Sequence, residues 1–517
     1  MENYKLLLVT SVQPKMMITL FPDNGLALIA SQASKAGFNP KILDFAVASN
    51  VGYPGSWEKL LYGWISPEVE NGYDVGFKFF ANQTAETLSV AQKTRDNFGR
   101  RVTLIASGPH VTYSPERFEE FLFNPITKKG IFDFIWSGEG YYAMPALRAF
   151  KEGRVSDKLE GERGFNNAHP RMSFYDKEGR LQRKSFKFVD QLDQFSTPDF
   201  SPETYPAMNG NEKFKRAVAT IYSAGCNYGK CIFCFHPIMS GPYRERSVDK
   251  IIEEDLYLNR LGISYHLIGG SSLEPVQANA IAKKRNELGL YVPGGVFINE
   301  RKPLEYDFKN MRKSGFELVF IGAESANPQE LVLLNKCLEI PQLEETVKRA
   351  KGEGINVITS FIYLGNEDNA KKTVELIKKI MPDGVTWLPL GVMPRTPLAI
   401  DKGLQEKLGI EIGEGYWDYF FMPKEGIDLT RRDKPILSGA QYTINRKTPS
   451  EIFGELMPFL KQVESFGIPV PVNGETFAVA RMLDKSVNQI RGLEQMFREG
   501  RKEEVLEEII KANQFKA

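Results

Sequence analysis

The sequence predicts an α/β protein with two parallel sheets and a mostly helical C-terminal region. Its 517 residues are too many for one hydrophobic core and indicate two or three domains. Two long stretches alternate short apolar runs with segments of helical spacing, a pattern typical of βα units in parallel sheets. A stretch without this alternation separates them. We therefore expect a doubly wound domain, then a partial (β/α)6 barrel, then helices.

The first domain, residues 1–150, is predicted from five strand-like runs. A stretch of helical spacing, GLALIASQASK at 25–35, lies between the first two runs and ends at Gly37. This arrangement fits a doubly wound, Rossmann- or flavodoxin-like sheet, in which ligands bind beyond the carboxyl ends of the strands. The predicted strands are 5–12, 40–45, 74–80, 102–107 and 132–137.

The remaining chain divides into three predicted parts. Residues 151–215 break the alternation and indicate a linker that packs as a small ribbon, with a hairpin turning at 177–179. Residues 216–400 restore the alternation, and a barrel of βα units carries its reactive groups at the carboxyl ends of its strands. Residues 401–517 are helical in pattern. The predicted barrel strands are 217–223, 264–270, 294–299, 318–323, 356–364 and 385–391.

The composition is that of an ordinary globular protein without a nucleic-acid or membrane signal. Lys and Arg number 66 against 65 Asp and Glu, so a net charge of +1 gives no electrostatic reason to expect nucleic acid as a partner. No apolar run approaches the roughly 20 residues that cross a bilayer. The start has no convincing secretory signal, and three of the four cysteines are clustered, which argues against a disulfide framework. We expect a cytoplasmic protein with reduced thiols.

Three cysteines lie close together directly after the first predicted barrel strand. Cys226, Cys231 and Cys234 are separated by four and then two residues, a spacing that fits two kinds of site equally well. A structural zinc site needs a fourth ligand, which His236 could supply. An iron–sulfur cluster on three thiolates instead keeps one iron open for a substrate or cofactor. The position at a barrel mouth favours the cluster, and the remaining Cys337 is expected to be a buried or loop thiol.

The cysteine loop resembles the cluster loop of the radical S-adenosylmethionine (SAM) superfamily. That family usually has three residues between its first two cysteines, whereas this chain has four, 227–230. IGAES at 321–325 resembles the segment that meets the ribose and methionyl part of SAM. LIGGSS at 267–272 occupies the place of a glycine-rich motif, with Ser271 where Glu is expected. The resemblance implies a [4Fe–4S] cluster on Cys226, Cys231 and Cys234, and SAM contacts from Phe233, Gly269, Gly270, Ser271, Glu324 and Ser325.

The first domain resembles the cobalamin-binding domains that are fused to radical SAM barrels. The segments 21–45, 106–116 and 132–147 carry this likeness, and FVDQLDQFSTPDF at 188–200 matches the connector in those proteins. No Asp-x-His-x-x-Gly segment supplies a cobalt-ligating histidine, and His110 is expected at the rim or in a structural role. A domain that keeps the fold without cobalamin remains an alternative. The resemblance implies cobalamin contacts from Ser11, Val12, Gln13, Thr84, Ser107, Gly108, Pro109, His110, Gly138, Glu139 and Gly140.

The resemblance implies a radical SAM enzyme. In that family an electron from the cluster cleaves SAM, the 5′-deoxyadenosyl radical takes hydrogen from an unactivated carbon, and methylcobalamin can then deliver a methyl group. We expect a cobalamin-dependent methyltransferase that acts on a small-molecule or peptide substrate and takes electrons from flavodoxin or ferredoxin. The alternatives are a radical rearrangement, cyclisation or coupling without methyl transfer, and a zinc-stabilised binding or scaffold protein.

Two further features concern the substrate. Five aromatic residues between 416 and 421 could line an apolar pocket, although a place in the core is the stronger expectation. Tyr363 and Arg395 are predicted to lie at the barrel mouth.

Overall fold

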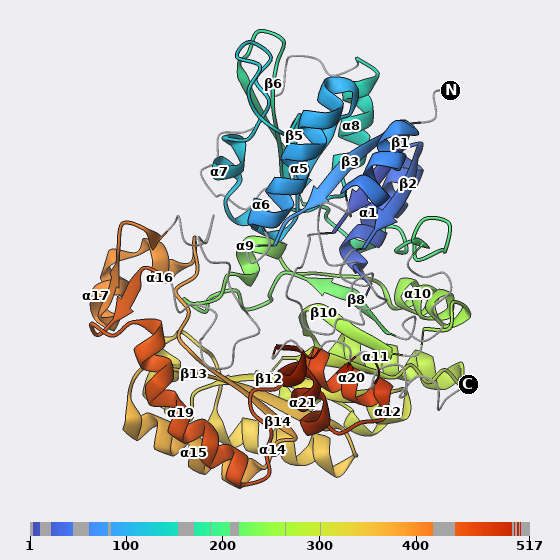
Figure 1. Cartoon of the computed structure of the whole chain (residues 1–517). Helices are drawn as coiled ribbons and strands as arrows, with labels where there is room; N and C mark the ends of the chain where they lie inside the picture. Colours follow the sequence, from blue (N-terminus) through green and yellow to red (C-terminus); the bar gives the residue numbers. More distant parts are fainter. Residues whose placement is uncertain are drawn as a thin grey trace. The chain divides into compact units, whose positions relative to one another are not determined.

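The computed structural model describes residues 4–10, 22–44, 61–80, 84–153, 170–186, 188–206, 217–263, 265–299, 301–416, 440–498, 501, 504, 505 and 507. The chain forms two compact units, which are labelled by element in Figure 1. Unit 1 comprises Met1–Lys215, Ile238–Arg244 and Asp418–Asp428. Unit 2 comprises Arg216–Pro237, Glu245–Trp417 and Leu429–Ala517. The division into four parts at residues 150, 215 and 400 stays a prediction.

Unit 1 is built on a seven-stranded sheet in the order β2-β1-β3-β4-β5-β6-β7. Its first five strands are parallel, as the sequence predicts. The order 2-1-3-4-5 is that of a flavodoxin-like sheet. In such a sheet the order in which strands are added reverses between β1 and β3, and ligands bind at the carboxyl ends of these two strands. The parallel strands are β1 (Tyr4–Val9), β2 (Phe38–Leu43), β3 (Tyr73–Lys78), β4 (Leu104–Ser107) and β5 (Phe134–Ser137).

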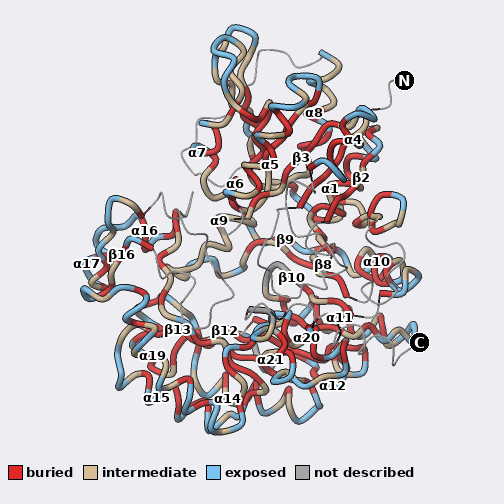
Figure 2. Tube along the Cα trace, viewed as in Figure 1, coloured by how far each residue is buried: buried red, intermediate tan, exposed pale blue. Residues whose placement is uncertain are grey.

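Apolar side chains on both faces of this sheet explain why its strands appear as continuous hydrophobic runs. In β1, Leu7 and Val9 join a core with Leu88 of helix α5 (Thr84–Phe98). The alternate residues Leu6 and Leu8 face α1 (Asn24–Lys35) and α8 (Ala143–Lys151). Helices therefore cover both faces, and Figure 2 shows the strands as largely buried.

The predicted ribbon adds two antiparallel strands to this sheet. Strand β6 (Arg171–Tyr175) pairs with β5, and β7 (Leu181–Ser185) pairs with β6. The sequence predicts a linker that packs as a small ribbon, and the hairpin is part of unit 1, with Met172 and Phe174 buried. Glu119 also holds it, through Arg183 at 2.6 Å and Ser173 at 2.7 Å. Burial opposes the charge of Glu119, but these hydrogen bonds outweigh burial and lower its pKa.

Unit 2 contains an open sheet of six parallel strands in chain order. The order is β14-β13-β12-β11-β10-β8-β9, so β14 does not close onto β8 and the sheet is a partial barrel. All six predicted barrel strands are present. Their bounds are β8 (Ala217–Ala224), β10 (Tyr265–Leu273), β11 (Gly294–Ile298), β12 (Phe316–Glu324), β13 (Asn356–Tyr363) and β14 (Gly384–Pro389), with β9 (Arg244–Glu245) at the edge.

Helices between the strands cover the outer face of the barrel sheet. They are α10 (Val248–Arg260), α11 (Pro275–Glu287), α12 (Phe308–Lys313), α14 (Ile340–Gly352) and α15 (Glu367–Ile380). In Figure 2 they are buried toward the sheet and exposed on the opposite side. Several of these helices begin at an N-cap residue whose side chain accepts a backbone hydrogen bond. In α10, for example, the Ser247 hydroxyl accepts from the N–H of Lys250.

The C-terminal region is mostly helical, as predicted, and its segment around Val472 packs against the barrel sheet. Val472 forms a core with Leu318 and Phe320 of β12 and with Ile358 of β13. The described C-terminal elements are α16 (Pro397–Ile400), α17 (Lys402–Leu408), β15 (Ile410–Ile412), β16 (Tyr442–Ile444), α19 (Pro449–Ser465), α20 (Gly474–Leu483) and α21 (Val487–Arg498).

Within the described ranges, no helix has the length and apolarity needed to span a membrane.

Candidate functional site

The three clustered cysteines lie where the sequence places them, in the loop that follows the carboxyl end of β8. Cys226, Cys231 and Cys234 are half-buried, and none of them forms a disulfide. Gly229 has a φ of 62°, a left-handed conformation that favours glycine. Its backbone N–H donates to the Sγ of Cys226 at 3.3 Å. The four-residue spacer between the first two cysteines thus turns back onto the first thiol.

Neighbouring loops hold the outer side of this cysteine loop. The Ile232 N–H donates to the carbonyl of Leu334 at 3.2 Å, and its own carbonyl accepts from Leu398 at 3.3 Å. Asn335 donates to the carbonyl of Lys230 at 2.8 Å and accepts a hydrogen bond from the Tyr228 hydroxyl at 3.0 Å. No sequence motif identified Asn335. Its left-handed φ of 51°, which Asn tolerates better than most residues, is the one local trace of its role.

An ion pair lies at the carboxyl end of β12. The Lys336 Nζ lies 3.2 Å from Oε1 of Glu324, and both side chains are nearly buried. A Cβ at Gly322 would lie 2.6 Å from Glu324 Oε1 and 3.0 Å from Lys336 Nζ, so this glycine makes room for the pair. Glu324 itself has a φ of 62°, a strained conformation that is common at functional sites. Sequence reasoning found Glu324 but missed Lys336, because lysine near a strand end carries no signal of its own.

The electrostatics of Cys234 link the cysteine loop to this ion pair. Burial raises the pKa of the Cys234 thiol, and the nearby Cys226 and Glu324 raise it further. The backbone N–H of His236 and the charge of Lys336 act in the opposite direction. These groups therefore lie close enough to interact. Because a metal-bound cysteine is a thiolate, metal binding here would release a proton.

The other predicted SAM residues are distributed around the same end of the barrel. Gly269, Gly270 and Ser271 lie in β10, whose pairing with β8 shifts register between Gly269 and Gly270. Such irregularities occur often beside active sites. Phe233 is half-buried between two of the cysteines. The predicted SAM contacts of these residues remain predictions.

Ser325 is tied into the fold by its side chain. Its hydroxyl donates to Glu330 at 2.5 Å and accepts from the N–H of Asn327 at 3.0 Å.

The side chain of Tyr363 points toward α19, since its hydroxyl lies 3.5 Å from Glu455. Burial, then Glu455, raises the Tyr363 pKa to about 12. Tyr363 is the last residue of β13, at the carboxyl end of the strand, and its place at the barrel mouth stays a prediction. Tyr416 is buried and donates to the carbonyl of Val392 at 2.8 Å, and the rest of its aromatic run, 417–421, lies outside the described residues.

The donor set fits an iron–sulfur cluster better than a single ion. Across the described ranges, no three His, Cys, Asp or Glu side chains gather closely enough to hold one metal ion. This arrangement does not match a preformed zinc site of three cysteines and His236. A cubane cluster is wider than an ion and spreads its thiolate ligands, and thiolates are the ligands that such clusters take. Cys226, Cys231 and Cys234 would hold it.

Polar side chains gather in unit 1 at the carboxyl ends of β1, β2 and β3. Asp44 accepts from the N–H of Asp23 at 3.3 Å and from the hydroxyl of Thr10 at 3.4 Å. Lys78 forms an ion pair with Asp23 at 2.6 Å. This is the edge where a doubly wound sheet binds its ligand. The predicted cobalamin contacts Ser11, Val12 and Gln13 follow β1 but lie outside the described residues.

Several predicted cobalamin residues follow β4. Gly108 has a φ of 108°, and a Cβ there would lie 2.7 Å from the backbone nitrogen of Phe79. His110, which follows Pro109, is buried and hydrogen-bonds through Nδ1 to the hydroxyl of Thr84. Thr84 and His110 are therefore brought together, in agreement with a structural role for the histidine. Ser107 borders an apolar cavity of about 50 Å³ that is lined by residues of α1, α8 and the sheet.

The last three predicted cobalamin-binding residues lie in the turn after β5. Gly138 donates its N–H to the hydroxyl of Thr112 at 2.8 Å. A Cβ at Gly140 would lie 2.1 Å from Ile29. Both carboxylate oxygens of Glu139 are engaged, by Arg244 at 2.8 Å and by the N–H of Val189 at 2.8 Å. The Glu139 carboxylate thus has a role in the fold. Cobalamin contacts at Gly138, Glu139 and Gly140 remain predictions.

The chain is similar in sequence to known proteins. Residues 220–380, which include the cysteine loop and strands β8–β13 almost entirely, match the radical SAM superfamily. This part of the chain is therefore a radical SAM domain. It is 26% identical over 388 residues to a Pyrococcus horikoshii protein named an uncharacterized methyltransferase, a match that covers 72% of this chain and 77% of that protein. The radical SAM domain implies a [4Fe–4S] cluster and SAM as cofactors, and it makes this chain an enzyme.

Two solved structures share the fold of nearly the whole chain. TsrM from Kitasatospora setae, a radical SAM methyltransferase solved with cobalamin and a [4Fe–4S] cluster, has a TM-score of 0.63 at 13% identity, covering 99% of this chain and all of TsrM. OxsB, a cobalamin-dependent SAM radical enzyme, has a TM-score of 0.58 at 16% identity. That match covers 90% of this chain and 62% of OxsB, so this chain spans about three-fifths of the OxsB length. The fold is thus that of the cobalamin-dependent radical SAM enzymes.

Proposed function

We propose that this radical SAM enzyme is a cobalamin-dependent methyltransferase that modifies an unactivated carbon of a small-molecule or peptide substrate. The observation that carries the proposal is the pairing of two structures in one chain. Three half-buried cysteines lie at the carboxyl end of a partial barrel, and a flavodoxin-like sheet with polar residues at its switch point precedes them. The names of the Pyrococcus horikoshii relative and of TsrM support methyl transfer.

When bound, the cluster would supply an electron for cleaving SAM, and a methylated cobalamin would supply the methyl group. The chain's own residues bind and position these groups. Cys226, Cys231 and Cys234 would hold the cluster by three thiolates and leave one iron for SAM. Glu324, oriented by Lys336, offers a carboxylate beside Cys234 for the polar part of SAM. The C-terminal segment around Val472 packs against the barrel sheet near the start of β12, which leaves the carboxyl end for substrate.

The test uses full-length protein, reconstituted with iron and sulfide without oxygen. It receives SAM that carries a deuterated methyl group, a chemical reductant and metabolite extracts, with and without added cobalamin. We expect a product that gains one labelled methyl group only when cobalamin is present. Cys226→Ala should abolish both SAM cleavage and labelling, whereas Cys337→Ala, which alters an exposed cysteine outside the loop, should retain iron and activity.

Other outcomes separate the alternatives. SAM cleavage with a modified product but no labelled methyl group, independent of cobalamin, would remove the methylation proposal and support a rearrangement, cyclisation or coupling. Protein that contains zinc and no iron after reconstitution would contradict the cluster itself. An acidic one-electron protein such as flavodoxin or ferredoxin, in place of the chemical reductant, tests the proposed electron donor.

A further inference from the structure

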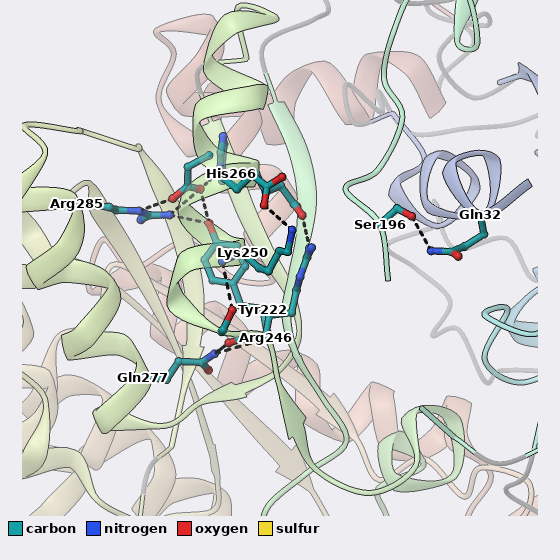
Figure 3. Close-up of polar contacts among 12 residues, drawn as sticks. Gln32, Ser196, Tyr222, Arg246, Lys250, His266, Gln277 and Arg285 are labelled. Atoms are coloured by element: carbon teal, nitrogen blue, oxygen red, sulfur yellow. Dashed lines mark hydrogen bonds and ion pairs between the residues drawn. The ribbon is translucent and has the colours of Figure 1, made fainter. Parts of the chain in front are cut away.

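A buried polar layer lies at the base of the cysteine loop, and the proposed reaction does not use it (Figure 3). Tyr222 lies two residues before the end of β8, where the loop begins, and Arg246 follows directly after β9, where the chain returns to the barrel sheet. We call these two residues the legs of the loop. The N–H of Arg246 donates to the carbonyl of Tyr222 at 2.9 Å, so the legs are joined by a backbone hydrogen bond. The three cysteines all lie between them.

One side chain reaches both legs. Gln277 lies in the first turn of α11 and is only 4% exposed. Its Nε2 donates to the carbonyl of Arg246 at 2.7 Å and approaches the carbonyl of Tyr222 at 3.4 Å. A carboxamide has two N–H donors, so one group can serve both carbonyls. Figure 3 shows Gln277 directed at this junction.

Buried charges fix each leg from its other side. Arg246 forms a hydrogen-bonded ion pair with Glu254 of α10, and both side chains are at most 5% exposed. The Tyr222 hydroxyl donates to Asp255 at 2.8 Å and accepts from Arg285 at 2.6 Å. Arg285 in turn pairs with Asp255 at 2.9 Å.

The buried layer is balanced in charge. Two arginines face two carboxylates, and burial lowers the pKa of the nearby His266 and so favours its neutral form. Removing one member of a buried pair is strongly destabilising, because the other charge is left without a partner. The legs are therefore held by groups that resist displacement.

We propose that Gln277 is a positioning residue for the iron–sulfur cluster, because its carboxamide sets the spacing between the two legs of the cysteine loop. The proposal rests on the proposed function, which places the cluster on this loop. Only Ser223, Ala224 and Gly225 separate Tyr222 from Cys226, so a shift of the first leg moves the first thiolate. Replacing residues that orient metal ligands typically costs about 10–100-fold in metal affinity or activity.

The test compares three full-length variants with the wild type after anaerobic reconstitution. Gln277→Met keeps the length of the side chain and removes both donors. Asn286→Leu is the matched control on the same helix, since it removes a side-chain bond to the carbonyl of Asn310 at 3.1 Å, away from the loop. Tyr222→Phe removes the buried hydroxyl but keeps the backbone carbonyl that Gln277 reaches, so it serves as a destabilised control.

The readouts are iron per chain, the electron paramagnetic resonance spectrum of the reduced cluster with and without SAM, and the melting temperature of the apoprotein. Burial raises the pKa of Glu254 to about 7, so the measurements are made near pH 8, where it is ionised against Arg246. We expect Gln277→Met to weaken iron binding about tenfold or more and to alter the spectrum and its response to SAM. Asn286→Leu should match the wild type, and Tyr222→Phe should melt earlier with a clearly smaller spectral change than Gln277→Met.

Gln277→Met protein with wild-type iron content and an unchanged spectrum would overturn the positioning role and leave the proposed function intact. An equal spectral change in Tyr222→Phe or Asn286→Leu would also overturn it, because general loosening would then explain the effect. If Gln277→Met does not fold, Gln277→Ala is measured in the same way. Wild-type protein that binds no iron would remove both this inference and the proposed function.

Discussion

Single residues at the barrel mouth show how chemistry and strain coincide. Glu324 ends β12 in a left-handed conformation, and Lys336 holds its carboxylate while Gly322 provides the space. A strained residue persists only where its surroundings hold it in place. The ion pair meets that condition, and its two charges act in opposite directions on the pKa of the Cys234 thiol.

A double-mutant cycle tests this ion pair. Lys336→Met and Glu324→Gln should each destabilise unit 2 in urea unfolding, because each leaves a nearly buried partner without its counterion. The double variant should lose less than the sum of the two, by about 0.5–3 kcal/mol. The same cycle at the exposed pair Lys371 and Asp368 is the control and should show little coupling. Additive losses at Lys336 and Glu324 would mean that the pair does not hold the strained residue.

At the scale of elements, strands were predictable and their partners were not. Parallel strands are buried on both faces, so runs such as that of β1 stand out as continuous apolar segments. The hairpin of β6 and β7 also has a clear turn at Gly179, with a φ of 75°. It pairs with β5, and its side chains are bound by Glu119, which lies more than 50 residues earlier in the chain. No local pattern contains that contact.

The start of α20 depends on a close approach that can be tested. A Cβ at Gly474 would lie 2.3 Å from the ring of Phe320, which is 5% exposed in β12. Gly474→Ala should therefore destabilise the protein by about 1–3 kcal/mol, because the packed ring has to move. Gly454→Ala is the control. It lies inside α19 with nothing within 4 Å of its Cβ, so alanine there should stabilise by up to about 1 kcal/mol.

Urea unfolding of both variants gives the comparison. Gly474→Ala protein as stable as the wild type would show that α20 does not begin against Phe320, and the packing of the C-terminal segment against the barrel sheet would need revision.

At the scale of the whole molecule, the two units carry separate parts of the proposed chemistry. The predicted cobalamin contacts all lie in the Met1–Lys215 part of unit 1, and the three cluster cysteines lie in unit 2. Arg244 and Arg246 mark the return of the cysteine loop. The first pairs with Glu139 in unit 1, and the second pairs with Glu254 in unit 2.

Because the two sets of residues lie in different units, we expect the iron–sulfur cluster and cobalamin to bind independently. The full chain with Cys226, Cys231 and Cys234 all changed to alanine should contain no iron, yet it should bind hydroxocobalamin as tightly as the wild type. The absorption of bound corrinoid after desalting measures this directly. Loss of cobalamin together with iron would contradict independent sites, and a wild-type chain that binds no cobalamin would favour a first domain that keeps only the fold.

The sequence by itself determined the features that local patterns express. Apolar runs marked the buried strands, and the spacing of three cysteines together with the segments around Gly269 and Glu324 marked a radical SAM site. These signals are readable because each is set by neighbours in the chain, through strand burial or through the short reach of a loop.

Only the tertiary structure decided what holds that site. Lys336, Asn335 and Gln277 reach the cysteine loop or its neighbours from other βα units, and the Tyr363 hydroxyl lies near Glu455 of α19. Each is an ordinary polar residue whose role depends on which strands lie side by side. That arrangement arises from packing between distant segments, so no spacing within the sequence reports it.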